Sequence, residues 1–433
     1  MIENIYLEPH TIDYRELTAR PKVESQQLST IIKDIYDQVE KLGDSALKDF
    51  TQRFDNCRLD SLLVSHQEID HSSSLVSEEL QIAIKAAKVN IEKFHSSQII
   101  KPISVKIVDG VDCSQKSVAI ERVGIYIPGG SAPLFSTVLM LAVPAMLAGC
   151  KEIVLCSPPN TKGDIHPAIL WTAKLCGITQ IFKVGGAQAI AAMSIGTKSI
   201  PRVSKVFGPG NQYVTSAKSY AQNYGVAMDM PAGPSELLVY ADDTCIPRFI
   251  AADLLSQLEH GSDSQVILVA TNSQIISIVN KEIENQIVDL PRISIVKEAL
   301  KNSKAVVISN EKEAFDFINE YAPEHLIVAS ENAKNYIGMI INAGSVFLGN
   351  YCPESAGDYA SGTNHTLPTD GWAKSYNGVN VDSFSRKITF QSISKYGIQH
   401  IGNTVITMAE NENLQAHANA VKVRLMNLKS DAI

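Results

Sequence analysis

The chain has 433 residues, of which 45% are hydrophobic and 19% charged, and this is enough apolar material for two sizeable domains. Its formal net charge of −8 argues against a nucleic-acid partner. The seven cysteines are odd in number and form no Cys-x-x-Cys pair, which argues against a disulfide framework or a cysteine zinc cluster and favours a reducing compartment.

The first residues lack the basic start and apolar run that are typical of a secretory signal. The most apolar segment, residues 134–150, is too short to span a membrane and contains Pro144. We therefore expect a soluble, cytoplasmic protein with no membrane partner.

Taken in order, the chain begins with a polar stretch over residues 1–22, which we expect to form an N-terminal arm lying on another part of the protein. Helical patterns follow at 26–54 and 75–95. From residue 118, strands, glycine turns and helices alternate, which predicts a parallel sheet covered on both faces. A second series of strands and helices begins at residue 236.

No low-complexity linker separates the two series, so we expect one half to be inserted into the other. The expected fold is α/β, with two Rossmann-like parallel-sheet domains. The first is predicted to combine residues 23–117 with 236–375, and the inserted domain to span 118–235. Residues 376–433 are expected to form a helical tail, in which a long amphipathic helix over 404–428 needs a partner such as a second subunit for its apolar stripe.

Three glycine turns follow strands of the inserted half, and glycine there lets the backbone approach a phosphate ahead of a helix. They are Pro128–Pro133, Val184–Gln188 and Phe207–Asn211. None has the spacing of a dinucleotide fingerprint, so ordinary tight turns are an equal alternative. Tyr126, Gln188 and Asn211 lie at the ends of strands, where ligands bind in open α/β sheets.

The segment Ala251–Gly261 is typical of a helix, with leucines at helical spacing and a glycine stop. Gln257 and His260 are three residues apart, so we expect both side chains on one face as two possible metal ligands. A histidine that interacts with the last carbonyls of the helix is the simpler alternative.

Glu324 and His325 stand side by side before an expected strand, where they can act as a general-base pair; an exposed turn is the alternative. Residues 350–368 are polar and rich in glycine, and we expect a structureless functional loop there. In this loop Asp358 is a possible oxygen ligand, and His365 a nitrogen ligand or hydrogen-bond donor.

His417 falls on the apolar stripe of the expected tail helix, where a histidine is usually a satisfied core group, and Glu412 lies just upstream. Several separate segments carry acidic residues and no Lys or Arg: 232–236, 257–260, 324–325, 350–368 and 408–421. If they converge, the pocket is electronegative and suits a cationic or metal-binding substrate. The cysteines are expected to be packing residues rather than thiol nucleophiles.

Five long motifs resemble those of histidinol dehydrogenases, and the similarity runs from about residue 20 to the C-terminal helix. They are Glu121–Leu134, Phe207–Asn211, Pro231–Glu236, Ser256–Gln265 and Ala322–Leu326. The resemblance implies a homodimeric enzyme that oxidises L-histidinol through L-histidinal to L-histidine, with two NAD⁺ and one zinc ion.

The same resemblance assigns residues. Zinc would be held by Gln257, His260, Asp358 and, from the partner subunit of the homodimer, His417. The acid/base pair carries over to Glu324 and His325, and NAD contacts carry over to Tyr126, Gln188 and Asn211. Substrate contacts carry over to Ser235, Gln257, His260, His325, Asp358, His365, Glu412 and His417.

In the implied chemistry, zinc mainly orients the amine and imidazole of the substrate. His325 takes the alcohol proton, and Glu324 activates a water for attack on the aldehyde. Two other interpretations remain. One is a zinc- and NAD-dependent dehydrogenase of the same family that acts on another amino alcohol or diol. The other is a non-catalytic, two-lobed binding protein.

Overall fold

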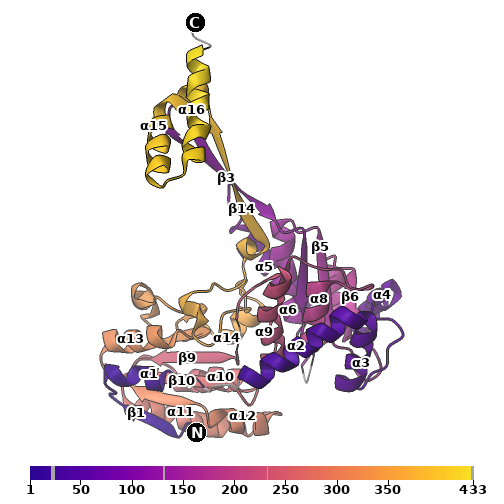
Figure 1. Cartoon of the computed structure of the whole chain (residues 1–433). Coiled ribbons are helices and arrows are strands. Elements are labelled where there is room, and N and C mark those ends of the chain that lie inside the picture. The colour runs from indigo at the N-terminus through magenta and orange to yellow at the C-terminus, as the bar shows by residue number, and fades with distance from the viewer. Residues whose placement is uncertain (21–24, 130–131, 232, 431–433) are drawn as a thin grey trace.

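The computed structural model describes residues 1–20, 25–129, 132–231 and 233–430. Two α/β units lie side by side, and a long hairpin carries a pair of helices away from them (Figure 1). The part of the first glycine turn at Gly130 and Ser131 lies outside the described residues, as do the portions of the expected arm, first domain and tail that fall in the gaps. The described residues include no helix that is long and apolar enough to cross a membrane.

The first unit is built on a six-stranded parallel sheet in the order β1–β11–β10–β9–β12–β13. Its strands are β1 (Asn4–Leu7), β9 (Glu236–Ala241), β10 (Gln265–Ala270), β11 (Lys304–Val307), β12 (His325–Ala329) and β13 (Ser345–Leu348). Every residue of β9, β10 and β12 is buried, as expected for central strands of a parallel sheet that is covered on both faces.

Helices cover both faces of this sheet. One face packs against α10 (Pro247–Leu258), α11 (Ser273–Ile287) and α12 (Ile293–Leu300). The other packs against α1 (Tyr14–Leu17) and α13 (Glu311–Tyr321). The expected N-terminal arm therefore lies on this unit and also adds the edge strand β1, which pairs with β11. Buried and exposed side chains do not alternate along this strand. Its place in the sheet therefore depends on backbone pairing rather than on a hydrophobic pattern.

The second unit is a five-stranded parallel sheet in the order β6–β5–β4–β7–β8. Its strands are β4 (Arg122–Tyr126), β5 (Glu152–Ser157), β6 (Gln180–Lys183), β7 (Lys205–Phe207) and β8 (Ala227–Met228). Its helices are α6 (Phe135–Ala148), α7 (Pro167–Leu175), α8 (Gly186–Ile195) and α9 (Gln212–Tyr220). The two parallel sheets confirm the predicted α/β fold class.

The N-terminal helices pack differently from the expected domain grouping. They are α2 (Ser25–Leu42), α3 (Asp44–Phe54), α4 (His66–Leu75) and α5 (Glu78–Ser96). Ile32 and Leu47 share a core with Val206 of the five-stranded sheet, and Ile84 shares one with Val123 of the same sheet. These helices therefore lie on the second unit, not on the first unit with residues 236–375. A helical period identifies an apolar face, but it does not identify the sheet that the face meets.

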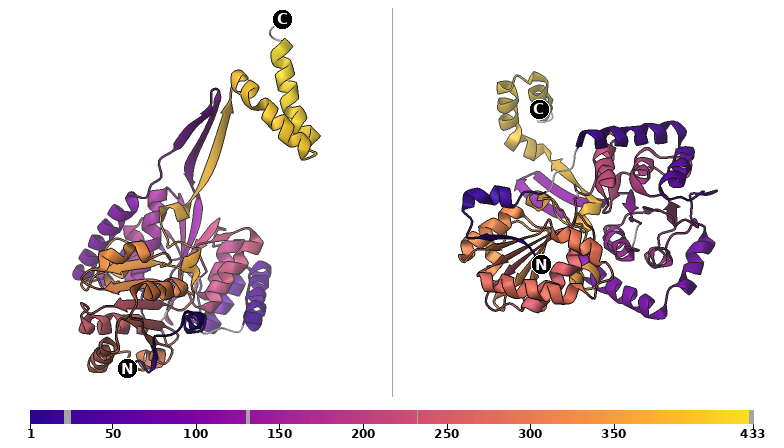
Figure 2. Two further views of the ribbon diagram at one scale, coloured as in Figure 1. Left: turned by 90° about the vertical axis from the view of Figure 1, so that its left-hand side faces the viewer. Right: turned by 90° about the horizontal axis from the view of Figure 1, so that it is seen from below.

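A hairpin and a tail project from the two units (Figure 2). The hairpin consists of β2 (Ile103–Val108) and β3 (Val111–Ala119), and β14 (Ser385–Ile393) pairs with β3 to complete a three-stranded antiparallel sheet. The tail is a pair of helices, α15 (Lys395–Asn411) and α16 (Gln415–Ser430). The single helix predicted over 404–428 is therefore wrong. The chain turns at Asn413, where a left-handed φ of 60° ends the helical path.

This turn changes what covers the expected apolar stripe. Val421 and Leu425 of α16 pack beside Gly402 of α15, so part of the stripe is covered within the same chain. The hairpin and tail nevertheless expose apolar side chains at Ile388, Phe390, Ile393, Val405, Met408 and Val423. Short 3₁₀ helices occur at Thr11–Asp13, Ala221–Tyr224, Ala333–Met339, Trp372–Lys374 and Val381–Phe384.

A buried ion pair holds the glycine turn after β7. Lys218 and Asp229 are each 1% exposed, and Lys218 Nζ lies 2.6 Å from Asp229 Oδ1. Both bind Gly208: Lys218 donates to its carbonyl oxygen and Asp229 accepts from its N–H, each at 2.8 Å. Removing one member of such a pair costs about 3–5 kcal/mol, because the other charge is left buried and unpaired.

Gly208 is required for close approach of two strands. Its φ is +124°, and a Cβ there would overlap the Tyr126 carbonyl oxygen. Glycine is therefore needed at position 208 for packing within the protein. This supports the interpretation of the segment as an ordinary tight turn.

Candidate active site

Glu324 and His325 lie where α13 ends and β12 begins. Ala322 closes α13 with a left-handed φ of 52°, and Pro323 leads the chain into the strand. Both side chains are buried, with relative exposures of 6% for Glu324 and 5% for His325. This burial excludes the alternative of an exposed turn.

The main chain of Glu236, the first residue of β9, holds both groups. Its N–H donates to Glu324 Oε2 at 2.9 Å, and its carbonyl oxygen lies 3.4 Å from His325 Nδ1. A carbonyl only accepts hydrogen bonds, so in this pairing Nδ1 carries the hydrogen and Nε2 keeps its lone pair. The arrangement leaves His325 Nε2 as the basic atom.

The expected structureless loop over 350–368 contains a short helix, α14 (Glu354–Tyr359). Its six residues are too few to show a hydrophobic period, which is why the sequence pattern did not reveal it. Glu354 and Asp358 are four residues apart and present their carboxylates on one face. His325 lies between them, with Nδ1 3.6 Å from Glu354 Oε1 and Nε2 3.8 Å from Asp358 Oδ1.

Gln257 and His260 also lie at this cluster, but they do not share one face of a helix as expected. The helix α10 ends at Leu258, so His260 lies beyond it and is exposed, whereas Gln257 is fully buried. The prediction that both leave one helical face is therefore wrong. The Glu354 carboxylate faces the Gln257 amide, which is satisfied when the amide nitrogen is turned toward it; this nitrogen then donates to both carboxylate oxygens, at 3.1 Å for Oε2. This orientation leaves Oε1 as the amide atom that can bind a cation.

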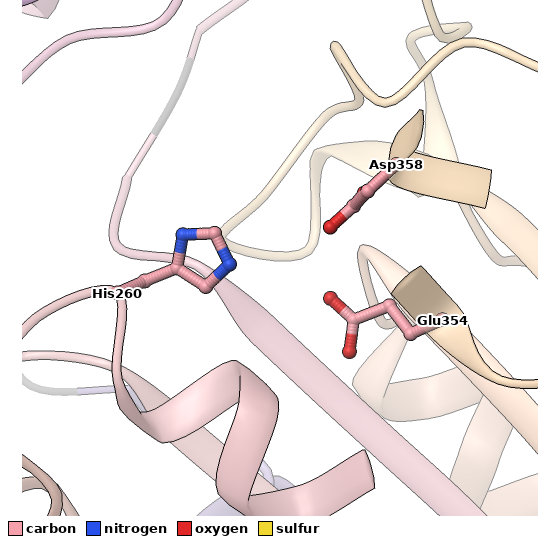
Figure 3. A group of neighbouring side chains, drawn as sticks. All are labelled: His260, Glu354 and Asp358. Carbon is pink, nitrogen blue, oxygen red and sulfur yellow. The ribbon is translucent and has the colours of Figure 1, made fainter. Parts of the chain in front are cut away.

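Three side chains of this region face one another with the spacing of a metal site (Figure 3). His260, Glu354 and Asp358 each offer a ligand atom, and these atoms all lie within 4.8 Å of one another. One imidazole and two carboxylates, without a thiolate, suit zinc or another divalent cation. Glu354 was not among the expected ligands, although its spacing to Asp358 was a signal that could have found it.

The electrostatics of the cluster favour a cation. Burial raises the pKa of Glu324 well above its usual value, and the negative charges of Glu236 and Asp358 raise it further. Burial likewise raises the pKa of Glu354, with added repulsion from Asp358 and Glu324. Burial lowers the pKa of His325 to about 4, so its imidazole is neutral near pH 7. A bound cation would relieve the repulsion among these carboxylates.

His365 connects the cluster to the second unit. Its Nδ1 lies 2.9 Å from the Asp358 carbonyl oxygen, and its Nε2 lies 3.1 Å from Thr137 Oγ1 of α6. By the same tautomer argument, Nδ1 donates and Nε2 accepts from the threonine hydroxyl. Asn364 Nδ2 also donates to the Met140 carbonyl oxygen of α6, at 2.6 Å. Ser235 is half-buried directly before β9, next to Glu236.

Tyr126, Gln188 and Asn211 line one cavity of about 1520 Å³. Tyr126 ends β4, Gln188 lies in the first turn of α8 after β6, and Asn211 precedes α9 after β7. The helices α2 and α3 form another wall of the cavity. The Tyr126 hydroxyl accepts from the Gly186 N–H at 2.9 Å, and the Asn211 side chain caps α9. The cavity exceeds the usual range for small-molecule sites, as an extended ligand requires.

Glu412 and His417 lie in the tail and are exposed. Glu412 directly follows α15, and His417 belongs to α16, which lies far from α10 and α14 (Figure 1). His417 is therefore not a buried core histidine. Within one chain it does not join Gln257, His260 and Asp358, and its contribution from a partner subunit remains a prediction.

Parallel α/β sheets occur in many enzymes that bind nucleotides, and a buried carboxylate–imidazole pair can transfer protons. NAD-dependent oxidoreductases combine both features. Residues 18–425 match the family model described as histidinol dehydrogenase. The histidinol dehydrogenase of Bacteroides thetaiotaomicron is 54% identical over 421 residues, covering 97% of this chain and 98% of the relative. That of Escherichia coli strain K12 is 47% identical over 421 residues, covering 96% of each.

A crystal structure of histidinol dehydrogenase from Elizabethkingia anophelis superimposes with a TM-score of 0.96 at 53% identity, covering 98% of each chain. The chain belongs to the histidinol dehydrogenase family. The predicted resemblance and the prediction of an oxidoreductase are confirmed, and the alternative of a non-catalytic binding protein is rejected. Membership of the family also implies a place in histidine biosynthesis.

The ligand cluster predicts an effect of Glu354 on metal binding. Glu354→Gln is expected to weaken Zn²⁺ affinity about 10- to 100-fold, because it removes a negative charge and the carboxylate that orients Gln257. Competition with a chromogenic chelator measures this affinity in the full-length protein. Glu284→Gln, on an exposed position of α11, is the matched control. Unchanged Zn²⁺ affinity in a folded Glu354→Gln protein would contradict a role for Glu354 in the metal site.

Proposed function

We propose that this chain is a zinc- and NAD-dependent histidinol dehydrogenase, which oxidises L-histidinol through L-histidinal to L-histidine. One observation carries the proposal: the buried Glu324–His325 pair lies directly beside the His260–Glu354–Asp358 cluster. A base and a metal-ligating group at one place allow a substrate to be held and deprotonated together.

The metal site of the proposal uses Gln257, His260, Asp358 and the partner subunit's His417, and Glu354 orients the Gln257 amide. The fit rests on the donor atoms, which are nitrogen and oxygen, and on the repulsion among buried carboxylates that a cation relieves. When bound, zinc supplies an orienting charge for the amine and imidazole of the substrate. Ser235, His365 and the partner subunit's Glu412 are the further substrate contacts that we propose.

NAD is assigned to the cavity lined by Tyr126, Gln188 and Asn211. The size of this cavity and its place at the carboxyl ends of parallel strands support the assignment. Bound there, NAD⁺ would supply the hydride acceptor for the alcohol step, and a second NAD⁺ would supply it for the aldehyde step.

The protein's own groups then move the protons. His325 is neutral, and its Nε2 has a free lone pair, so it takes the hydroxyl proton as the carbinol becomes an aldehyde. Glu324 then activates a water that adds to the aldehyde carbon. The resulting hydrate loses a proton and a hydride and becomes the carboxylic acid. Burial makes the Glu324 carboxylate a stronger base, because its pKa is raised.

The homodimer is proposed from the tail. The three-stranded sheet and the tail expose apolar side chains away from both units, among them Ile388, Phe390 and Met408, and a second subunit would cover them. The same subunit would carry His417 and Glu412 to the site. A cytoplasmic location follows from the biosynthetic role in this proposal.

Two NADH are expected for each histidinol consumed, because four electrons leave the substrate. Cys150→Ala is expected to leave turnover nearly unchanged. Burial raises the pKa of that thiol to about 11, and no thiolate takes part in the chemistry. NADH absorbance and histidine yield measure the stoichiometry. One NADH per histidinol, or loss of activity in folded Cys150→Ala, would overturn the mechanism. Faster turnover of another amino alcohol or diol would favour the other substrate class within the family.

Glu324→Gln is expected to slow the aldehyde step about 10²- to 10⁴-fold and the alcohol step much less, because only the former needs a base for water. Single-turnover assays started with histidinal and with histidinol separate the two steps. His325→Gln is the comparison, and it should slow the alcohol step. Equal losses in both steps for Glu324→Gln would refute the division of roles.

A further inference from the structure

Arg20, from the N-terminal arm, places its positively charged guanidinium close to the Glu324–His325 pair. None of the segments predicted to converge contains a Lys or Arg, so the sequence pattern missed this contact. The guanidinium forms a bidentate pair with Glu236: Nη2 lies 2.8 Å from Oε2, and Nε pairs with Oε1. The side chains of Arg20 and Glu236 are only 14% and 4% exposed. Such a desolvated, two-point pair fixes orientation as well as charge.

The same guanidinium also holds the other segment that carries the catalytic pair. Arg20 Nη2 donates to the Tyr321 carbonyl oxygen at 2.8 Å, and the guanidinium carbon lies 4.0 Å from the centre of the Tyr321 ring. Tyr321 is the last residue of α13, and the left-handed turn at Ala322 separates it from Glu324. Arg20 therefore contacts both the start of β9 and the end of α13.

These two segments are the ones that fix the catalytic groups. Glu236 donates its N–H to Glu324 and offers its carbonyl oxygen to His325. A shift of the Glu236 main chain would therefore change the position of the Glu324 carboxylate and the hydrogen bond that sets the His325 tautomer. Asp370 strengthens the arrangement, because its N–H donates to Glu236 Oε1 at 3.0 Å.

We propose that Arg20 is a positioning residue for the Glu324–His325 pair and acts through Glu236. This inference rests on the proposed function. Other contacts anchor the arm independently of the Arg20 pair. Lys304 Nζ donates to the Leu17 carbonyl oxygen at 2.5 Å, and the Ile2 N–H donates to Asn280 Oδ1 at 2.7 Å. Loss of the bidentate pair should therefore disturb the catalytic geometry more than the docking of the arm.

Arg20→Lys tests this proposal, because lysine keeps the charge and loses the planar two-point contact. We expect kcat for histidine formation to fall about 10- to 100-fold, while KM for histidinol and the midpoint of thermal unfolding stay near the wild-type values. Arg15→Lys, at an exposed position of α1, is the matched control and should behave as wild type. Unchanged kcat, or a loss of kcat that follows a loss of thermal stability, would overturn the proposal.

Two further measurements complete the test. In Arg20→Ala, added methylguanidinium is expected to restore part of the lost kcat; no rescue in folded protein would count against the proposal. The ¹⁵N NMR signals of the His325 ring should report the Nδ1–H tautomer in wild type and a changed tautomer or mixture in both Arg20 variants. Identical spectra would contradict the inference. This readout needs no histidinol, so failure of the proposed function is distinguishable from failure of the positioning role.

Discussion

The crowding of acidic side chains around a neutral imidazole is the constraint on which the rest of this structure depends. Glu324 and Glu354 are almost fully buried, Asp358 lies next to both, and no Lys or Arg belongs to the segments that carry them. Three carboxylates that lie this close together and are buried from solvent repel one another. They stay ionised only beside a cation. Arg20 satisfies Glu236, at the edge of the cluster. The remaining negative charge faces His260 and defines the place where a metal-ligating, amine-bearing substrate would fit.

The sheet topology creates this crowding. Because β9 and β12 are neighbours in the six-stranded sheet, residues almost ninety positions apart meet at the start of two parallel strands. Glu324 and His325 therefore lie at the amino end of β12, whereas Tyr126 lies at the carboxyl end of β4 and Asn211 lies beyond that of β7 in the five-stranded sheet. The usual rule for ligands in open α/β sheets describes only the second site. The hydrogen bond between His365 and Thr137 joins the two units at the boundary between the sites.

Local patterns in the sequence predicted the alternation of strands and helices from residue 118 and again from residue 236, and the two parallel sheets with their covering helices confirm it. Contacts over long distances were beyond the reach of these patterns. The helices α2 and α5 have clear apolar faces, but nothing in their period shows that they pack on the five-stranded sheet. The turn at Asn413 interrupts a helical pattern without a glycine or a proline. In the site, the partner-subunit role proposed for His417 came from family resemblance. Arg20 was recognised only from its partners in space, whereas Glu354 was missed although its four-residue spacing to Asp358 was present in the sequence.

In the proposed homodimer, the tail of one subunit completes the cation site of the other. Subunit exchange between two inactive homodimers, His260→Ala and His417→Ala, tests it most directly. If the tail acts in trans, each mixed dimer contains one site with an intact His260 and an intact His417 from its partner, and an equal mixture should recover about a quarter of wild-type histidinol oxidation. If mass spectrometry shows exchange and the mixture stays inactive, His417 does not act in the site of the partner subunit.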